Sequence, residues 1–289
     1  MNHKDFQVPE GKQINLADYD ADFTGNFADK EAGLADLDKS REKIIRLQDV
    51  MYAEKVHALL IIFQAMDAAG KDSTVKHVFA GLNPQALQTA AFKPPTEEEL
   101  DHDFLWRASK VLPERGKIGM FSRSYYEEVL VVRVHPEILT AAPLPEKIKN
   151  DPKIWDKRLE DIRHYEKYLT NNGVSILKFF INISRDEQKQ QFMERIDDPS
   201  KHWKFSFGDL GDRARWDDYM RAYETAFAAT STDRAPWYVI PGNKRWFTRA
   251  TIAKIIADKL ESLDLKYPEV SEKQKQQIAE AKRMLENEN

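Results

Sequence analysis

Residues 63–74, FQAMDAAGKDST, combine a lysine and two aspartates with a glycine turn, and these residue types could bind phosphate and a metal ion. The segment follows the apolar run VHALLIIF and leads into a helical pattern, which is the setting that a phosphate-binding loop requires. At such a turn backbone N–H groups point toward an anion, while Lys71 supplies a mobile positive charge. We therefore predict a phosphate site formed by Ala68, Ala69, Gly70, Lys71, Asp72, Ser73 and Thr74.

The loop departs from the common pattern G-x-x-x-x-G-K-[ST], because Ala65 replaces the first glycine and Asp72 replaces the Ser/Thr. Asp67 and Asp72 would repel phosphate unless a divalent cation lay between them, and such oxygen ligands suit Mg²⁺. We therefore predict Mg²⁺ as the cofactor. The pattern equally fits a structural alternative, in which Gly70 serves the backbone of a strand-to-helix turn and the aspartates cap the helix.

A second group of charged residues follows the strand pattern KIGMFS at residues 117–122. The segment FSRSYYEEVLVVRVHP places Arg123, Glu127 and Arg133 just beyond the carboxyl edge of the predicted sheet, where open α/β folds bind ligands. An arginine there could brace phosphoryl oxygens, because its planar guanidinium makes two parallel hydrogen bonds. Two candidate phosphate-binding segments are thus expected at one edge of the sheet.

Short apolar segments alternate with helical patterns along the chain, which predicts an α/β fold with a parallel sheet. The strands are expected at residues 56–66, 117–122, 174–183 and 235–242, and the helices at 30–53, 96–111, 152–172 and 213–230. Residues 1–29 lack periodicity and are expected to form an extended arm on the body. The polar segment 271–289 predicts a helix that packs peripherally by a narrow stripe containing Ile278 and Leu285.

The composition indicates a folded protein and argues against some kinds of binding partner. A 289-residue chain with 42% hydrophobic and 32% charged residues is typical of a folded protein, and we expect one domain over residues 1–289. The net charge of −4 argues against a nucleic-acid-binding protein, so attraction to a polyanion would need local basic clusters. No N-terminal apolar leader or membrane-length run is found, and with no cysteine we predict a cytoplasmic protein with no membrane partner. The scattered histidines predict no zinc site.

Several segments taken together resemble polyphosphate kinase family 2, over roughly Ile45 to Tyr267. They are FQAMDAAGKDST, FSRSYYEEVLVVRVHP, ILKFFINISRDEQ, RIDDPSKHWKFS and APWYVIPGNKRWF. The loop is similar to the family's M-D-x-A-G-K-D form, which accounts for both departures noted above. The resemblance implies a three-layer P-loop kinase of thymidylate-kinase-like architecture, with a helical lid and Mg²⁺-dependent transfer between inorganic polyphosphate and nucleotides. It also implies a homo-oligomer, either a dimer or a tetramer.

The resemblance also implies roles for single residues. Asp67 matches the family's loop aspartate, with a catalytic and metal-related role, and Lys71 matches its phosphate-binding lysine. Arg123 matches the arginine of the F-x-R-S turn, which would brace phosphoryl oxygens during transfer. Glu127 stands where class III members, which accept nucleoside mono- and diphosphates, carry an acid that would hold Mg²⁺ or its waters. We therefore predict phosphorylation of AMP and ADP, with guanine nucleotides as further candidate substrates.

Residues 184–207 resemble the family's lid, which implies phosphate contacts from Lys189, Arg195, Lys201 and Lys204. Their mixed charges equally fit an exposed amphipathic helix. The aromatic residues Trp203, Phe205 and Phe207 could stack on a base or belong to the core. Further along the chain, Lys244 and Arg245 could contact a long anionic donor or lie in a surface loop.

Two other functions remain open at this point. An ATP-dependent nucleoside monophosphate kinase would use the same architecture, although the atypical loop argues against it. A non-catalytic module that binds polyanions would keep the loop for structural reasons, but the joint presence of Asp67, Lys71, Arg123 and Glu127 argues against that function.

Overall fold

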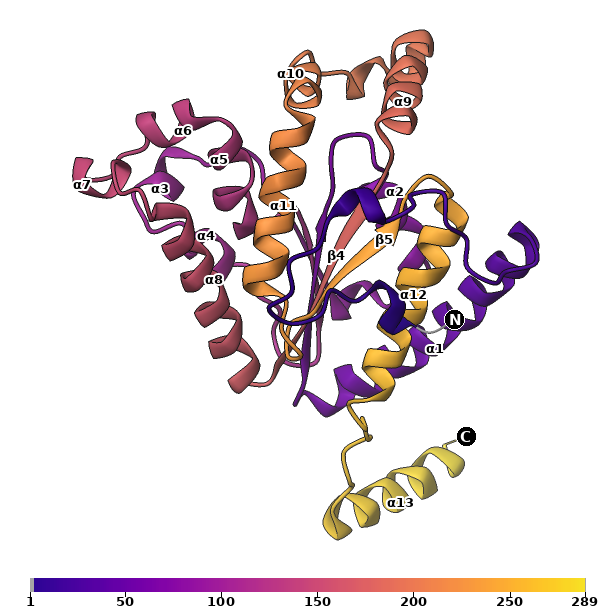
Figure 1. Cartoon of the computed structure of the whole chain (residues 1–289). Coiled ribbons are helices and arrows are strands. Elements are labelled where there is room, and N and C mark those ends of the chain that lie inside the picture. The colour runs from indigo at the N-terminus through magenta and orange to yellow at the C-terminus, as the bar shows by residue number, and fades with distance from the viewer. Residues whose placement is uncertain (1–2, 289) are drawn as a thin grey trace.

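The computed structural model describes residues 3–288, which form a parallel five-stranded sheet with helices on both faces (Figure 1). The strand order is β2-β3-β1-β4-β5, and every neighbouring pair is parallel. The strands are β1 Ala58–Gln64, β2 Leu87–Ala91, β3 Ile118–Ser122, β4 Val174–Asn182 and β5 Trp237–Pro241. All of β1 is buried, as expected of a central strand whose sequence is an unbroken apolar run. The predicted α/β class is confirmed.

The helices form one layer on each face of the sheet. Helices α1 Lys30–Glu54, α2 Lys71–Val78 and α12 Arg245–Glu261 pack together on one face, and α8 Ile154–Asn171 and α11 Trp216–Thr230 pack together on the other. The other α-helices among the described residues are α3 Glu97–Leu100, α4 Trp106–Ser109, α5 Val131–Val134, α6 Pro136–Ala141, α7 Glu146–Lys149, α9 Arg185–Asp197, α10 Gly208–Ala214 and α13 Glu272–Glu286. The 3-10 helices are η1 His3–Phe6, η2 Leu16–Asp18, η3 Pro84–Ala86, η4 Tyr125–Val129 and η5 Pro199–Lys204.

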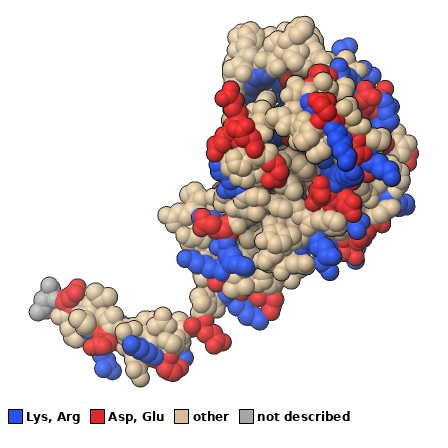
Figure 2. Space-filling model, turned by 90° about the vertical axis from the view of Figure 1, so that its left-hand side faces the viewer, with Lys and Arg blue, Asp and Glu red and all other residues tan. Residues whose placement is uncertain are grey.

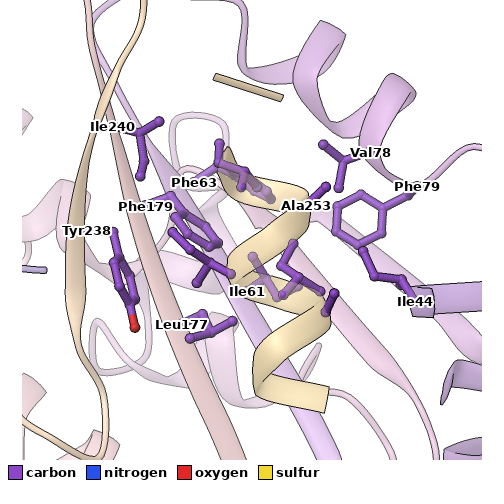
Figure 3. Close-up of a cluster of buried hydrophobic side chains, with 14 of the residues drawn as sticks. Ile44, Ile61, Phe63, Val78, Phe79, Leu177, Phe179, Tyr238, Ile240 and Ala253 are labelled. Carbon is purple, nitrogen blue, oxygen red and sulfur yellow. The ribbon is translucent and has the colours of Figure 1, made fainter. Parts of the chain in front are cut away.

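A hydrophobic core fills the space between the sheet and the layer of α1, α2 and α12 (Figure 3). Phe63 of β1 stacks on Phe179 of β4 with ring centroids 5.6 Å apart, and Ile44 and Ala253 reach the same cluster from the helices. This packing fixes the end of β1, from which the phosphate loop begins.

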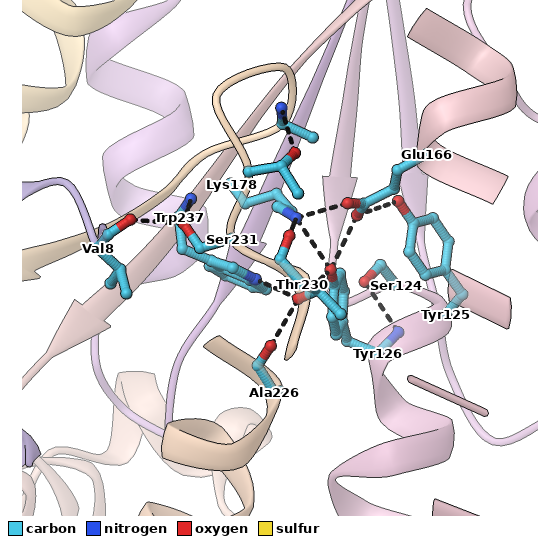
Figure 4. A network of polar contacts seen from close by, with 12 residues as sticks. Val8, Ser124, Tyr125, Tyr126, Glu166, Lys178, Ala226, Thr230, Ser231 and Trp237 are labelled. Carbon is cyan, nitrogen blue, oxygen red and sulfur yellow. Dashed lines mark hydrogen bonds and ion pairs between the residues drawn. The ribbon is translucent and has the colours of Figure 1, made fainter. Parts of the chain in front are cut away.

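The opposite layer contains a buried polar network (Figure 4). Lys178 of β4 donates hydrogen bonds to Glu166 Oε2 (2.5 Å), to the Tyr126 hydroxyl (3.0 Å) and to the Thr230 carbonyl (2.8 Å). The hydroxyls of Tyr125 and Tyr126 each donate to Glu166 Oε1 over 2.9 Å. Burial raises the pKa of Glu166 and lowers that of Lys178, while their mutual attraction opposes both shifts. The network therefore holds the η4 turn, through Tyr125 and Tyr126, against the sheet.

The structure differs from the predicted elements in two places. The single helix expected at residues 96–111 is broken into α3 and α4, since the Asp103 side chain accepts a hydrogen bond from the Leu105 N–H and starts a new turn. Strand β2 was not predicted, because its sequence LQTAA lacks an apolar run and it lies half-exposed at the edge of the sheet. The helices predicted at 30–53, 152–172 and 213–230 are confirmed as α1, α8 and α11, within a few residues at each end.

The C-terminal helix α13 stands away from the body of the molecule (Figures 1 and 2). Its residues are all exposed, including Ile278 at 61% and Leu285 at 65%, so the prediction that it packs against the body is wrong. The helix starts with a capping box at Ser271 and Gln274, which stabilises it locally without tertiary contacts. No helix within residues 3–288 is both long enough and apolar enough to cross a membrane.

Candidate active site

The phosphate loop connects β1 to α2 at the carboxyl edge of the sheet. Gly70 at φ +85° precedes α2, which begins at Lys71, so the first N–H groups of the helix open toward the loop. Ala68 at φ +65° also has a left-handed backbone, which is unusual for a residue with a Cβ. Such strained residues gather at functional sites, where the surrounding structure holds them.

Lys71 lies over this loop rather than in solvent. Its ammonium donates hydrogen bonds to the Ala65 carbonyl (2.9 Å) and the Met66 carbonyl (3.3 Å). Burial lowers the pKa of Lys71, and the negative charge of Asp67 opposes that shift. The ammonium makes no ion pair within the described residues, so its charge is available to an anion.

Arg123 joins the loop to the end of β3. Its backbone N–H donates to the Phe63 carbonyl over 3.0 Å, and its guanidinium Nη2 lies 2.9 Å from Asp67 Oδ1. Burial lowers the pKa of Arg123, but the charges of Glu127 and Asp67 outweigh this effect and raise the pKa above its usual value. Like Ala68, Arg123 is left-handed, at φ +62°. Asp67, which follows β1, and Arg123, which follows the adjacent strand β3, are therefore brought together.

Glu127 lies in a small recess beside this ion pair. The recess is lined in part by Asp67, Arg123 and Tyr223, and Glu127 is carried there by the η4 turn. Burial raises the pKa of Glu127, and the charge of Arg123 opposes that shift. At its side lies Gln64, the last residue of β1, which is fully buried and whose Oε1 has no hydrogen-bond partner among the described residues. Gln64 was missed by sequence reasoning, although a polar residue ending an apolar strand was a signal for it.

Asp67 and Glu127 are the carboxylates that could hold a metal ion in this recess. Within residues 3–288 no cluster of three or more His, Cys, Asp or Glu side chains could hold one by itself. Mg²⁺ needs no such cluster, because it keeps several waters and binds one or two carboxylates together with substrate phosphates. The pair of carboxylates therefore fits Mg²⁺ and does not resemble a zinc site.

Most of the predicted phosphate-binding residues line one cleft of about 470 Å³. Arg195, Lys201 and Lys204 reach it from the lid, opposite the loop residues 67–73. Sequence reasoning missed Lys93, which follows the unpredicted edge strand β2, and Asp209 of α10. Arg245, whose role was left open, lines the cleft as well.

Three predicted residues do not reach this cleft. Arg133 of α5 lines a separate hollow with Gln13, and Lys189 of α9 is exposed and is not among the residues that line the cleft. Phosphate contacts of Arg133 and Lys189 therefore stay predictions from the sequence, since helical spacing does not reveal which face of α5 or α9 meets the site. Thr74 is 3% exposed and turned into the protein, so only its backbone belongs to the loop.

Helix α9 and η5, which cover the predicted lid at residues 184–207, rise above the carboxyl ends of the strands, and α10 follows them (Figure 1). Gln188 of α9 donates to the Asp67 carbonyl over 3.0 Å, and Arg195 lies 3.2 Å from Asp209. Trp203 and Phe207 are 79% and 80% exposed, which excludes the alternative that they belong to the core. On the face shown in Figure 2, acidic and basic side chains are interspersed. The lining of the cleft holds more cations than acids, seven Lys and Arg side chains beside four Asp and Glu side chains.

Comparison with known proteins assigns the chain to a family. A family model described as Polyphosphate kinase 2 matches residues 27–268, which is most of the chain. The chain belongs to the polyphosphate kinase 2 family. The predicted resemblance is thereby confirmed, and the sheet, loop and lid described above are those of a polyphosphate kinase 2 family member.

Relatives match over nearly the whole length. An ADP-polyphosphate phosphotransferase of Rhodopseudomonas palustris is 44% identical, with 98% of each chain covered. An AMP/ADP-polyphosphate phosphotransferase of Meiothermus ruber is 43% identical, covering 92% of this chain and 96% of that one. The crystal structure of Polyphosphate Kinase 2 from Arthrobacter aurescens TC1 superimposes with a TM-score of 0.84 at 42% identity, covering 93% of this chain and 92% of that one.

The left-handed backbone of Ala68 in this polyphosphate kinase leads to a prediction about stability. Ala68→Gly is expected to raise the free energy of unfolding by about 0.5–1 kcal/mol, because relief of the Cβ clash outweighs the entropy that glycine gains on unfolding. Urea unfolding of both proteins measures the change. Ala69→Gly is the matched control: this neighbour is buried and has no positive φ, so its replacement should lower stability. Equal losses in both variants would contradict the assignment of strain to Ala68.

Proposed function

We propose that this chain transfers phosphoryl groups from inorganic polyphosphate to AMP and ADP, reversibly and with Mg²⁺ as cofactor. The observation that carries the proposal is the convergence of Asp67, Lys71 and Arg123 at the carboxyl edge of the sheet, in a chain of the polyphosphate kinase 2 family. A kinase needs cations where charge moves between the donor and acceptor oxygens, and this is where the three side chains meet.

Each side chain has a separate proposed task. Lys71 and Arg123 hold the oxygens of the transferred phosphoryl group, and Arg123 is oriented for this by its ion pair with Asp67. The carboxylates of Asp67 and Glu127 would hold Mg²⁺, which supplies charge neutralisation between phosphates when bound. Arg195, Lys201 and Lys204 approach the same phosphates from the lid and exclude water from them.

The choice of acceptor rests on the sequence around Glu127. The R. palustris relative is named for ADP, whereas the M. ruber relative is named for AMP and ADP. We propose the broader, class III specificity because Glu127 and the segment VLVVRVHP resemble that subgroup. Guanine nucleotides, a homo-oligomer, a cytoplasmic location and the absence of nucleic-acid or membrane partners stay predictions from the sequence. So does the division of the single domain into an arm with first helix (1–53), a core (about 54–267) and a C-terminal helix (about 270–289).

Separate ATP-free reactions of long-chain polyphosphate with AMP and with ADP test this function. With Mg²⁺ present we expect ADP from AMP and ATP from ADP, resolved by chromatography. Product from ADP alone would refute the class III specificity and leave the family's activity in place. Transfer only from ATP would favour an ordinary nucleoside monophosphate kinase, and binding of polyphosphate with no transfer from any donor would favour a non-catalytic module.

A further inference from the structure

Gln188 of α9 joins the lid to the phosphate loop through its side-chain amide. The side chain is fully buried, which is uncommon for a glutamine. Its Nε2 donates to the Asp67 carbonyl over 3.0 Å, and its Oε1 accepts from Arg213 Nη1 over 3.0 Å. Because one end of the amide meets an acceptor and the other end meets a donor, the contacts fix the orientation of the side chain.

The start of α9 is itself fastened to the body of the molecule. The backbone N–H of the N-cap residue Ser184 donates to Asn243 Oδ1 over 2.9 Å, and Asn243 Nδ2 donates to Ser184 Oγ over 3.1 Å. Arg213 of α10 donates in addition to the Arg185 carbonyl over 2.6 Å. A polar network in which each member has its partners holds one arrangement of the chain. Gln188 therefore meets the loop from a fixed position.

The contact falls on the peptide bond that leads into the strained residue of the loop. Ala68 follows Asp67, has a left-handed backbone at φ +65° and lines the cleft. A residue with a Cβ needs its surroundings to hold it in that conformation. In a planar trans peptide the carbonyl and the following N–H point in opposite directions, so the contact that holds the Asp67 carbonyl also sets the direction of the Ala68 N–H. That N–H has no hydrogen-bond partner within residues 3–288, which leaves it available to an anion in the cleft.

We propose that Gln188 is a positioning residue of the phosphate loop, which directs the Ala68 N–H toward the bound phosphate and keeps the Asp67 carboxylate beside Arg123. The inference rests on the proposed function, because it assumes that the loop binds phosphate during transfer. Gln188 does not line the cleft, so it acts through the loop and not by touching the substrate. It holds the backbone of Asp67, while Arg123 Nη2 holds the carboxylate at 2.9 Å from Oδ1.

Gln188→Glu separates the two contacts of the amide. The introduced carboxylate keeps the shape of the side chain and can still accept from Arg213, but in its ionised form it cannot donate to the Asp67 carbonyl. We expect kcat for transfer from long-chain polyphosphate to ADP to fall roughly 10-fold to 100-fold, because small displacements of positioned groups are costly, with the KM for ADP changed little. Gln188→Met, which adds no charge, should show a similar fall and so excludes repulsion of phosphate as the cause.

The matched control is Gln190→Glu. Gln190 lies on the same helix, but it is exposed and does not line the cleft, so the same change of charge should leave kcat nearly unaltered. Thermal unfolding without ligand checks that each variant is folded. If Gln188→Glu fails to fold, the comparison of Gln188→Met with wild type decides. Unchanged kcat in the folded Gln188 variants would mean that Gln188 only packs the lid, and would overturn the proposal.

Combination with Ala68→Gly tests whether Gln188 acts through the loop. Glycine adopts the left-handed backbone without the penalty of a Cβ, so the loop should depend less on the contact from α9. The fall in kcat caused by Gln188→Glu should therefore be several-fold smaller in the Ala68→Gly protein than in the wild type. Equal falls in the two backgrounds would contradict a role through Ala68.

A binding measurement without turnover separates this inference from the proposed function. With Mg²⁺ and tripolyphosphate but no nucleotide, wild type and Gln190→Glu should gain thermal stability, because the ligand binds the folded state. Gln188→Glu and Gln188→Met should gain much less. A wild type that gains stability but transfers no phosphate would refute the proposed function, while the gains of the variants would still decide the role of Gln188. Equal gains in wild type and both Gln188 variants, or no gain in wild type, would overturn the positioning of the loop toward phosphate.

Discussion

Replacement of Lys71 with methionine is expected to lower kcat/KM for transfer from polyphosphate by roughly 100-fold to 1000-fold, the usual cost of removing a preorganised charge from a transition state. The ammonium lies over the phosphate loop, held by two backbone carbonyls, so it meets the phosphoryl oxygens without first being ordered. Methionine keeps the length of the side chain and removes the charge. The fold should therefore stay intact while catalysis is lost.

The matched control for this variant is Lys76→Met. Lys76 lies on the same short helix, but it is exposed and does not line the cleft, so its loss should change the rate little. Initial rates with ADP and long-chain polyphosphate, measured under identical Mg²⁺ concentrations, compare the two variants. Similar rates for Lys71→Met and wild type would mean that the loop only forms a strand-to-helix turn and does not bind phosphate. That is the structural alternative that the sequence left open.

How well the sequence predicted the site depended on the strand that carries each residue. Strands β1 and β3 are apolar and buried, so their ends could be located, and with them Asp67, Lys71 and Arg123. Strand β2 lies at the edge of the sheet with a polar, half-exposed sequence, and Lys93 after it was missed for that reason. Buried apolar runs predict strands well, whereas edge strands owe their existence to pairing, which a single segment does not reveal.

The lid shows the same limit in a helical element. Its position in the chain was predicted, but the mixed charges around α9 leave no clear apolar face. The sequence therefore did not show that Arg195 lines the cleft and that Lys189 does not. The orientation of α9 depends on tertiary contacts such as Gln188 to the Asp67 carbonyl and Arg213 to Gln188. Contacts between segments so far apart in the sequence have no local signature.

The buried pair of Lys178 and Glu166 leads to the largest expected effect on stability. Lys178→Met is expected to lower the free energy of unfolding by about 3–5 kcal/mol, because it leaves Glu166 as a buried carboxylate without its counter-ion. Urea unfolding with linear extrapolation measures the loss. Lys157→Met is the control: it removes a lysine from the exposed ion pair with Asp151, and pairs of that kind contribute little to stability.

The double variant Lys178→Met, Glu166→Gln separates the buried charge from the lost packing. The amide introduced by Glu166→Gln would be neutral and its oxygen could still accept from Tyr125 and Tyr126, so the double variant should be more stable than Lys178→Met alone. If both variants lost the same stability, the cost would lie in packing around Lys178 and not in the unpaired charge. Those tyrosines lie between Arg123 and Glu127 in the chain, at the start of the η4 turn, so they help to position both site residues. A folded double variant that still transferred phosphate would therefore show that hydrogen bonds to the side chain at position 166 are enough to place the turn, without the ammonium of Lys178.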